Sequence, residues 1–217
     1  MKTKPSSTAL DRKTVALGKT VFQLRQDIDL HRIIGLNASA LRTADVSTTF
    51  FGHVQRLALT SLAVNLCKIF EFESRHPLCS IPAILNDLPH GFPQYYDRER
   101  FQEFALKHHG DPNAKSGAAI IRSGYEATRK KNEKALERLR KFRNKIAVHL
   151  EFDAALDSLP SHNAFEDLWT FAHDTYEIVH DQYNRIGPAM MRKSVLVGLR
   201  RTFEQLGVKK PTFEFKR

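Results

Sequence analysis

Apolar residues recur along the chain at the three- and four-residue spacing of amphipathic helices, and no stretch shows the strict alternation of a half-buried strand. This spacing predicts helices over residues 11–30, 44–72, 80–88, 98–108, 114–148, 163–186 and 194–206. Residues 1–10 are expected to form a loose start. Residues 33–42 are ambiguous, because Gly35 and Asn37 indicate a break. The run over 114–148 is the longest helix that we expect.

Proline and capping residues set the ends of some of these helices. The pair His76-Pro77 closes the helix over 44–72, because the residue before a proline disfavours helical backbone. Ser80 followed by Pro82 predicts an N-cap with proline in the first turn of the next short helix. Long helices joined by short loops predict an all-α fold, an up-and-down helical bundle with short inserted helices.

The apolar stripes of these helices predict where the core lies. The stripe of the helix over 44–72 consists of Phe51, Val54, Leu57, Ala58, Leu62, Leu66, Ile69 and Phe70. The broad aromatic side of the helix over 163–186 is expected to be core and not a base-stacking surface. We expect residues 1–43 to form an N-terminal helical extension, 44–187 the bundle, and 188–217 a C-terminal helix and basic tail packed on the bundle.

The net charge of the chain indicates which kind of partner the helical bundle could bind. The 217 residues carry 34 Lys and Arg against 24 Asp and Glu, a formal net charge of +10. Such a balance favours polyanionic partners, nucleic acid first and acidic membrane surfaces second. The basic residues are densest over 129–145. This run has two interpretations, a solvated helix face or a cationic ridge beside a phosphate-binding cleft.

Several function classes lack support in the sequence. Cys67 and Cys79 form no CxxC pair, so we expect neither a disulfide framework nor a zinc site, and a reducing compartment fits. No apolar stretch reaches the length of a membrane span, and no secretory signal follows the N-terminus. We therefore expect a cytoplasmic protein. Phosphate-binding glycine loops, dinucleotide-binding motifs and serine-hydrolase motifs are also missing from the sequence.

One short motif places chemistry at the end of the long run. Arg143, Asn144 and His149 resemble the Arg-x(4–6)-His motif of HEPN domains, in which Asn commonly follows the Arg. The wider pattern is similar to the abortive-infection U-type (AbiU2-like) branch, in which a long apolar helix ends in an acid, here Glu71, before a short helix. That branch has Ala next to the His, whereas Val148 separates them here. The resemblance covers about residues 44–185.

The resemblance implies a metal-independent RNA endonuclease without cofactors, a toxin or phage-defence effector. It also implies a homodimer that brings two motifs to one cleft, and an antitoxin or regulatory protein is a possible further partner. Catalytic roles would fall to Arg143, His149, Asn144 and Glu71. The candidate RNA-binding residues are the neighbouring cations Arg138, Arg140, Lys141 and Lys145.

These residue types suit RNA cleavage by the RNA's own 2′-hydroxyl. Histidine exchanges protons near neutral pH, and the arginine fork donates two bonds to phosphate oxygens while it stays charged. Asn144 could donate to phosphate or orient His149, and Glu71 could pair with Arg143 or place a substrate hydroxyl. On a straight helix, residues six apart differ by about 240° and about 9 Å. Arg143 and His149 therefore share no face unless the helix ends or bends between them.

Other interpretations of these residues stay open at this point. His149 could be a helix C-terminal histidine that interacts with the last carbonyls, and Glu71 a plain solvated acid. The pair Arg25 and His31 has the same spacing as the motif, but two acids lie between them. We therefore interpret this pair as a chance match to the motif. A non-catalytic module that binds RNA or protein is the alternative function.

A metal site is a third interpretation. The motif Glu177-x-x-His180 matches half of a di-metal carboxylate site, and Glu73-x-x-His76 could supply the other half. His173 shares the helix face of Glu177 and His180. Because the two further glutamates have no evident source, we expect no metal.

Overall fold

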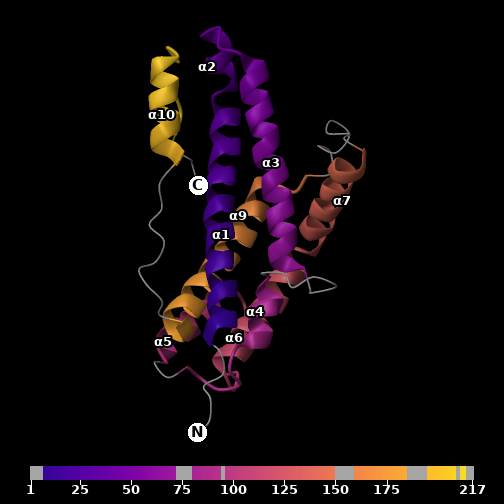
Figure 1. Ribbon diagram of the computed structural model, residues 1–217, viewed down its shortest axis with the longest axis vertical. Helices are drawn as coiled ribbons and strands as arrows, with labels where there is room; N and C mark the ends of the chain where they lie inside the picture. Colours follow the sequence, from indigo (N-terminus) through magenta and orange to yellow (C-terminus); the bar gives the residue numbers. More distant parts are fainter. Residues whose placement is uncertain are drawn as a thin grey trace.

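The computed structural model describes residues 7–71, 80–93, 96–149, 159–184, 195–208 and 211–213. Every regular element in these residues is helical, so the expected all-α bundle with short inserted helices is confirmed. Two long helices stand side by side and run in opposite directions, α1 (Ser7–Leu36) and α3 (Thr48–Phe70), joined by the short α2 (Ala38–Thr43) (Figure 1). Among the described helices, none has the length and apolarity needed to span a bilayer.

The remaining helices surround this pair. The short α4 (Ile81–Asp87), α5 (Arg98–Lys107) and α6 (Gly117–Lys131) gather near the N-terminal end of α1 (Figure 1). The helix α7 (Glu133–His149) packs against α3, and α9 (His162–Val179), which continues as a π-helix (His180–Asn184), packs against α1. The last helix, α10 (Val195–Gln205), lies beside the α2 end of α1 (Figure 1).

Serine and aspartate N-caps begin most of these helices where the sequence breaks. The Ser80 hydroxyl accepts from the amide of Ala83 at 3.3 Å, as its position before Pro82 predicts. The same use of an N-cap side chain recurs in the part of the chain that the structure describes, at Ser47, Asp97, Ser116 and Ser161. Each cap satisfies an amide that the first helical turn leaves without a partner.

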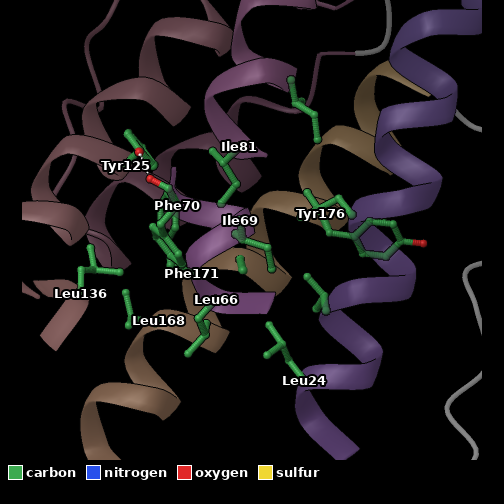
Figure 2. Close-up of a cluster of buried hydrophobic side chains, with 14 of the residues drawn as sticks. Leu24, Leu66, Ile69, Phe70, Ile81, Tyr125, Leu136, Leu168, Phe171 and Tyr176 are labelled. Carbon is green, nitrogen blue, oxygen red and sulfur yellow. Dashed lines mark hydrogen bonds between the residues drawn. The ribbon is translucent and has the colours of Figure 1, made fainter. Parts of the chain in front are cut away.

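One main core joins α1, α3, α4, α5, α6, α7 and α9. Figure 2 shows its centre, where the ring of Phe70 stacks on Tyr125 at 6.1 Å between centroids and lies the same distance from Phe171. The Tyr125 hydroxyl donates to the carbonyl of Phe70 at 2.9 Å. This bond fixes the last turn of α3 against α6. A smaller cluster at the other end packs α10 on α1, α2 and α3, with Phe203 and Phe51 at 5.6 Å.

The long helix expected over 114–148 is in fact two helices, which is a correction to the sequence interpretation. The break lies at buried Asn132, with φ −104° and ψ 18°. Its side chain donates to the carbonyl of Thr128 at 3.1 Å, while its own carbonyl accepts from Leu136. An asparagine amide competes with the backbone for such bonds, so it favours a break inside a helical pattern. The longest described helix is therefore α1, with 30 residues.

Other helices also begin or end at residues that differ from those expected from the sequence. Helix α1 begins at Ser7, inside the expected loose start, and it passes Gly35 before Asn37 separates it from α2. The Asn37 amide is held by the carbonyls of Ile33 and Thr212, at 2.9 Å each. Leu57 is 57 % exposed, so its expected place in the buried stripe of α3 is wrong. Helical spacing alone does not say how wide a face the neighbours cover.

Candidate functional site

The acid predicted to follow the long apolar helix lies at the C-terminus of α3. Phe70 is buried and bonded by Tyr125, and the next residue, Glu71, leaves the helix in an extended conformation with φ −82° and ψ 144°. The Glu71 amide still donates to the carbonyl of Cys67 at 2.9 Å. The core therefore fixes the backbone, and the Glu71 carboxylate projects from a well-anchored residue at the edge of the bundle.

Two arginines of α7 face that carboxylate. Leu139 and Phe142 are fully buried, so they fix α7 against the core and set the position of the residues beside them. Arg143 Nη1 donates to Glu71 Oε1 at 2.6 Å, and Arg140 Nε lies 4.0 Å from the same oxygen. The Arg143 and Glu71 side chains are 28 % and 25 % exposed. The pairing of Glu71 with Arg143 that the sequence suggested is confirmed.

Asn144 supports the same guanidinium from the other side. Its Oδ1 accepts from Arg143 Nε at 3.3 Å, so Arg143 is bonded through two of its nitrogens. Two guanidinium groups share one carboxylate, so among the described residues the positive charge here exceeds the negative charge. A fork of donors in a fixed orientation is suited to a phosphate group.

The thiol of Cys67 lies beneath these charges. Burial raises the pKa of Cys67 to about 11, although the Arg143 and Arg140 charges act to lower it and Glu71 adds to the rise. The thiol is therefore neutral at physiological pH and is not a nucleophile here. Cys67 is 2 % exposed and belongs to the main core near the end of α3.

His149 is the last residue of α7, and its side chain lies outside the described part of the structure. The helix does not end between positions 143 and 149. On a continuous α-helix these two positions differ by about 240° around the axis and about 9 Å along it. Within one chain, α7 therefore places the two motif positions on different faces.

The predicted RNA-binding cations fall on two sides of α7. Arg140 belongs to the side of Glu71, whereas Arg138 and Lys141 are exposed on the outer surface. Lys141 lies 2.8 Å from Glu137, one turn earlier, a spacing at which opposite charges support a helix. Lys145 is half-buried. The cationic run is thus neither wholly solvated nor wholly directed at the site.

Arg25, the arginine of the second Arg-x(5)-His motif, forms structural ion pairs. Arg25 donates to Asp29 and, at 2.6 Å, to Glu166 of α9, and its guanidinium lies 5.0 Å from the centroid of Trp169. Its side chain is only 11 % exposed. Burial alone would lower the pKa of Arg25, but its bonds to the two acids raise it. A guanidinium enclosed by two carboxylates is not available to phosphate, in contrast to Arg143.

His31 lies in the same region of α1 and differs chemically from a catalytic histidine. Burial lowers its pKa to about 4, and the charge of nearby His162 adds to the effect. Its Nδ1 is buried with no hydrogen-bond partner among the described residues. A histidine with so low a pKa is a weak base at neutral pH, so it takes protons from a substrate poorly.

The residues of the metal interpretation are only partly brought together. His173, Asp174 and Glu177 offer ligand atoms within 4.8 Å of one another. Asp174 is already approached by Lys107 at 2.6 Å and His108 at 2.7 Å, so a cation would compete with an ammonium group for this carboxylate. His180 instead approaches Asp181 at 2.8 Å. The other half of the expected motif, residues 73–76, lies outside the described residues.

Sequence reasoning missed one surface feature next to the arginines. A hollow of about 250 Å³ lies between α6 and α7, beside the break at Asn132. Its lining consists of Glu126, Arg129, Lys130, Glu133, Leu136 and Arg140. The signal that could have revealed it is Asn132 itself, a poor helix former in the middle of a charged run.

Comparison with known proteins identifies the family of this chain. No curated protein and no solved structure matches it. The model of the AbiU2 family, a HEPN family, matches residues 7–189. The match includes α1, which lies outside residues 44–185 that carried the resemblance, while the division of the chain at residues 43 and 187 stays a prediction. Because the matched region is most of the chain and contains both Glu71 and the Arg143 motif, the protein belongs to the AbiU2 family of HEPN domains.

Proposed function

We propose that this protein is a metal-independent RNA endonuclease of the cytoplasm, acting as a toxin or phage-defence effector. The observation that supports this most is the guanidinium of Arg143, oriented by Glu71 and Asn144 at a half-open, positively charged surface. Family membership supports it independently, because the motif resembles that of HEPN nucleases. No cofactor is required by the reaction proposed below.

In the proposed reaction the RNA supplies its own nucleophile. The 2′-hydroxyl loses its proton and its oxygen bonds to the adjacent phosphorus, while the bond from phosphorus to the 5′-oxygen breaks. The leaving 5′-oxygen gains a proton, so the products are a 2′,3′-cyclic phosphate and a 5′-hydroxyl. His149 moves these protons, and Arg143 stabilises the negative charge that builds up on the phosphate oxygens.

The other site residues have supporting roles. Glu71 holds Arg143 before RNA arrives and offers an acceptor for a substrate hydroxyl, and Asn144 fixes the guanidinium plane. Arg138, Arg140, Lys141 and Lys145 bind the flanking phosphates. Binding of that kind adds affinity without selecting sequence, and it weakens as salt displaces the contacts.

A homodimer is part of this proposal. Since α7 continues through position 149, Arg143 and His149 lie on different faces of one helix. A second copy of the chain, related by a two-fold axis, would supply the histidine to the arginine of its partner, and the reverse. An antitoxin or regulatory protein that separates or covers the two copies would then silence both sites together.

The test is RNA cleavage in EDTA by the wild type and His149→Ala. We expect fragments that end in 2′,3′-cyclic phosphate for the wild type and a loss of about 10²–10⁴-fold for the variant, as for removal of a proton-transfer group. His90→Ala is the matched control, because His90 is an exposed histidine outside the site. Equal cleavage by His149→Ala and His90→Ala would refute the assignment.

Arg143→Lys separates catalysis from simple charge. Lysine keeps the positive charge but loses the fork that binds two phosphate oxygens. We expect RNA binding within a few-fold of the wild type and a clear loss of cleavage. If the wild type binds RNA in this assay and yields no fragments under any condition, the alternative function holds, and the protein is a non-catalytic binding module.

A further inference from the structure

The hollow between α6 and α7 has a mixed lining that is unusual for a plain charged surface. Lys130 and Arg129 lie on the α6 side, and Arg140 on the α7 side. Two acids, Glu126 and Glu133, line it as well. Among the described residues, neither acid has a hydrogen bond or an ion pair with a neighbour. Two exposed carboxylates that have no such partner in the described part of the chain, beside cations, suit a ligand with both an anionic group and N–H donors.

An apolar wall completes this hollow. Leu136 lines it from α7, and this side chain also belongs to the main core, part of which is drawn in Figure 2. Leu136 is only 3 % exposed, so it offers a base little apolar area and mainly limits how deeply the base can enter the hollow. The volume of about 250 Å³ lies below the range of small-molecule pockets, which starts at roughly 300 Å³. The hollow therefore holds at most one nucleotide.

The hollow is continuous with the proposed cleavage site through one side chain. Arg140 lines the hollow and also lies 4.0 Å from the Glu71 oxygen that accepts from Arg143. Along α7, Leu136 and Arg140 precede Arg143 by about 10 Å and about 4.5 Å. A strand of RNA that is bound at Arg143 and runs along α7 would pass the hollow with a neighbouring nucleotide.

We propose that this hollow is a nucleotide subsite that selects guanine in the RNA strand. This inference rests on the proposed function only in taking RNA as the natural ligand. Lys130 and Arg140 contact the phosphate, Leu136 contacts the base, and the acids Glu126 and Glu133 read the base edge. Guanine presents two adjacent donors, N1–H and N2–H, which a carboxylate accepts in parallel. Uracil presents a single N–H between two carbonyl oxygens. These oxygens are acceptors and repel the carboxylate oxygens, which are acceptors too.

The test is titration of the full-length protein with guanosine and uridine 5′-monophosphates in EDTA, followed by NMR or calorimetry. Neither mononucleotide has an internucleotide bond to cleave, so binding is measured apart from catalysis. We expect guanosine monophosphate to bind in the millimolar range or tighter, with about tenfold preference over the uridine compound, as for one good bidentate base contact.

Variants assign this preference to the hollow. We expect Glu126→Gln with Glu133→Gln to remove it, while Glu137→Gln keeps it, because Glu137 lies on the same helix and pairs with Lys141 outside the hollow. Lys130→Ala should weaken both nucleotides about equally, with Lys134→Ala as its control. Retained tenfold preference in the double variant, equal affinity of the wild type for both nucleotides, or no binding to the wild type would each overturn the proposal.

The outcome is distinct from that of the cleavage test. RNA fragments without nucleotide binding leave the nuclease proposal standing and remove the subsite. Nucleotide binding with guanine preference, but without RNA fragments, supports the subsite and removes the nuclease proposal.

Discussion

Arg143 donates to Glu71 at 2.6 Å, across 72 positions of sequence, and so joins the end of α3 to the side of α7. Arg140 lies 4.0 Å from the same carboxylate oxygen. One acid therefore holds two guanidinium groups near each other, against their mutual repulsion. This arrangement fixes the direction of the Arg143 donors before any anion binds, and it places a carboxylate where an RNA phosphate would otherwise bind most tightly.

The first prediction concerns the charge of Glu71. Glu71→Gln removes the negative charge that competes with RNA phosphate for Arg143. An ion pair that is partly exposed contributes ~1 kcal/mol, so we expect RNA to bind about fivefold more tightly to the variant. Cleavage should fall by about tenfold or more, because Arg143 loses its fixed orientation. Binding is measured by fluorescence anisotropy with 2′-O-methyl RNA, which cannot be cleaved, and cleavage by fragment analysis with unmodified RNA.

Glu137→Gln is the control for this experiment, since Glu137 is exposed and pairs with Lys141 away from Glu71. It removes the same charge from the same region of the surface. Equal effects of the two variants on RNA binding would show that net charge alone is responsible. An increase of cleavage in Glu71→Gln would contradict the orienting role.

The second prediction concerns pH and His31. Burial lowers the pKa of His31 from an ordinary value of 6.5 to about 4. Between these two values the unfolded chain binds more protons than the folded one, so stability falls as the pH drops from 6.5 to about 4. The loss from this residue amounts to at most about 3 kcal/mol. Urea unfolding at pH 7 and pH 4.5 measures how much the free energy of unfolding falls on acidification. This fall should be smaller in His31→Gln than in the wild type, and an equal fall in both proteins would contradict the prediction.

The third prediction concerns a buried carboxylate between α1 and α3. Burial raises the pKa of Asp27, although hydrogen bonds from Ser61 at 2.7 Å and Gln23 at 3.0 Å oppose the shift. The folded chain therefore binds this proton more readily, and stability falls as the pH rises from 3.8 through the raised pKa. Asp27→Asn carries no charge to bury. We expect it to be more stable than the wild type at pH 7.

Thermal unfolding of both proteins at pH 7 and pH 4 measures this difference. The gain from Asp27→Asn should shrink at pH 4, where more of the wild-type aspartate is protonated than at pH 7. The Ser61 hydroxyl can turn and the Gln23 amide can flip to suit an asparagine, so the network keeps its bonds. A loss of stability at pH 7 would mean that the charged form is required there.

The fourth prediction concerns a close approach of α1 and α9. A Cβ at Gly18 would lie 2.5 Å from Cε2 of Tyr176, so alanine forces the tyrosine ring to move. We expect Gly18→Ala to lower the free energy of unfolding by about 1–3 kcal/mol. Gly52→Ala in α3 meets no atom within 4 Å and should raise it by about 0.5–1 kcal/mol. Urea unfolding at neutral pH checks both; effects of the same sign would contradict the packing argument.

The sequence by itself determined the helical class, most helix positions and the residues that form the Arg143 motif. The spacing of apolar residues and the capping residues are local properties of the sequence. Ser80 before Pro82 therefore predicted α4 and its N-cap correctly. The acid at position 71 was found from its place after an apolar helix, and the family from the same features. Local patterns work here because each depends on residues within a few turns of one another.

Tertiary structure alone decided which of two similar arginines is exposed to a ligand. Arg25 and Arg143 have the same spacing to a histidine, yet Arg25 is enclosed by Asp29 and by Glu166, which is 141 positions away. Among the described residues, Arg143 instead meets one acid, Glu71, and its side chain is 28 % exposed. Helix packing brings such distant charges together, and spacing along one helix carries no information about them. The hollow beside Asn132 depended likewise on the angle between α6 and α7, which only their packing on the core sets.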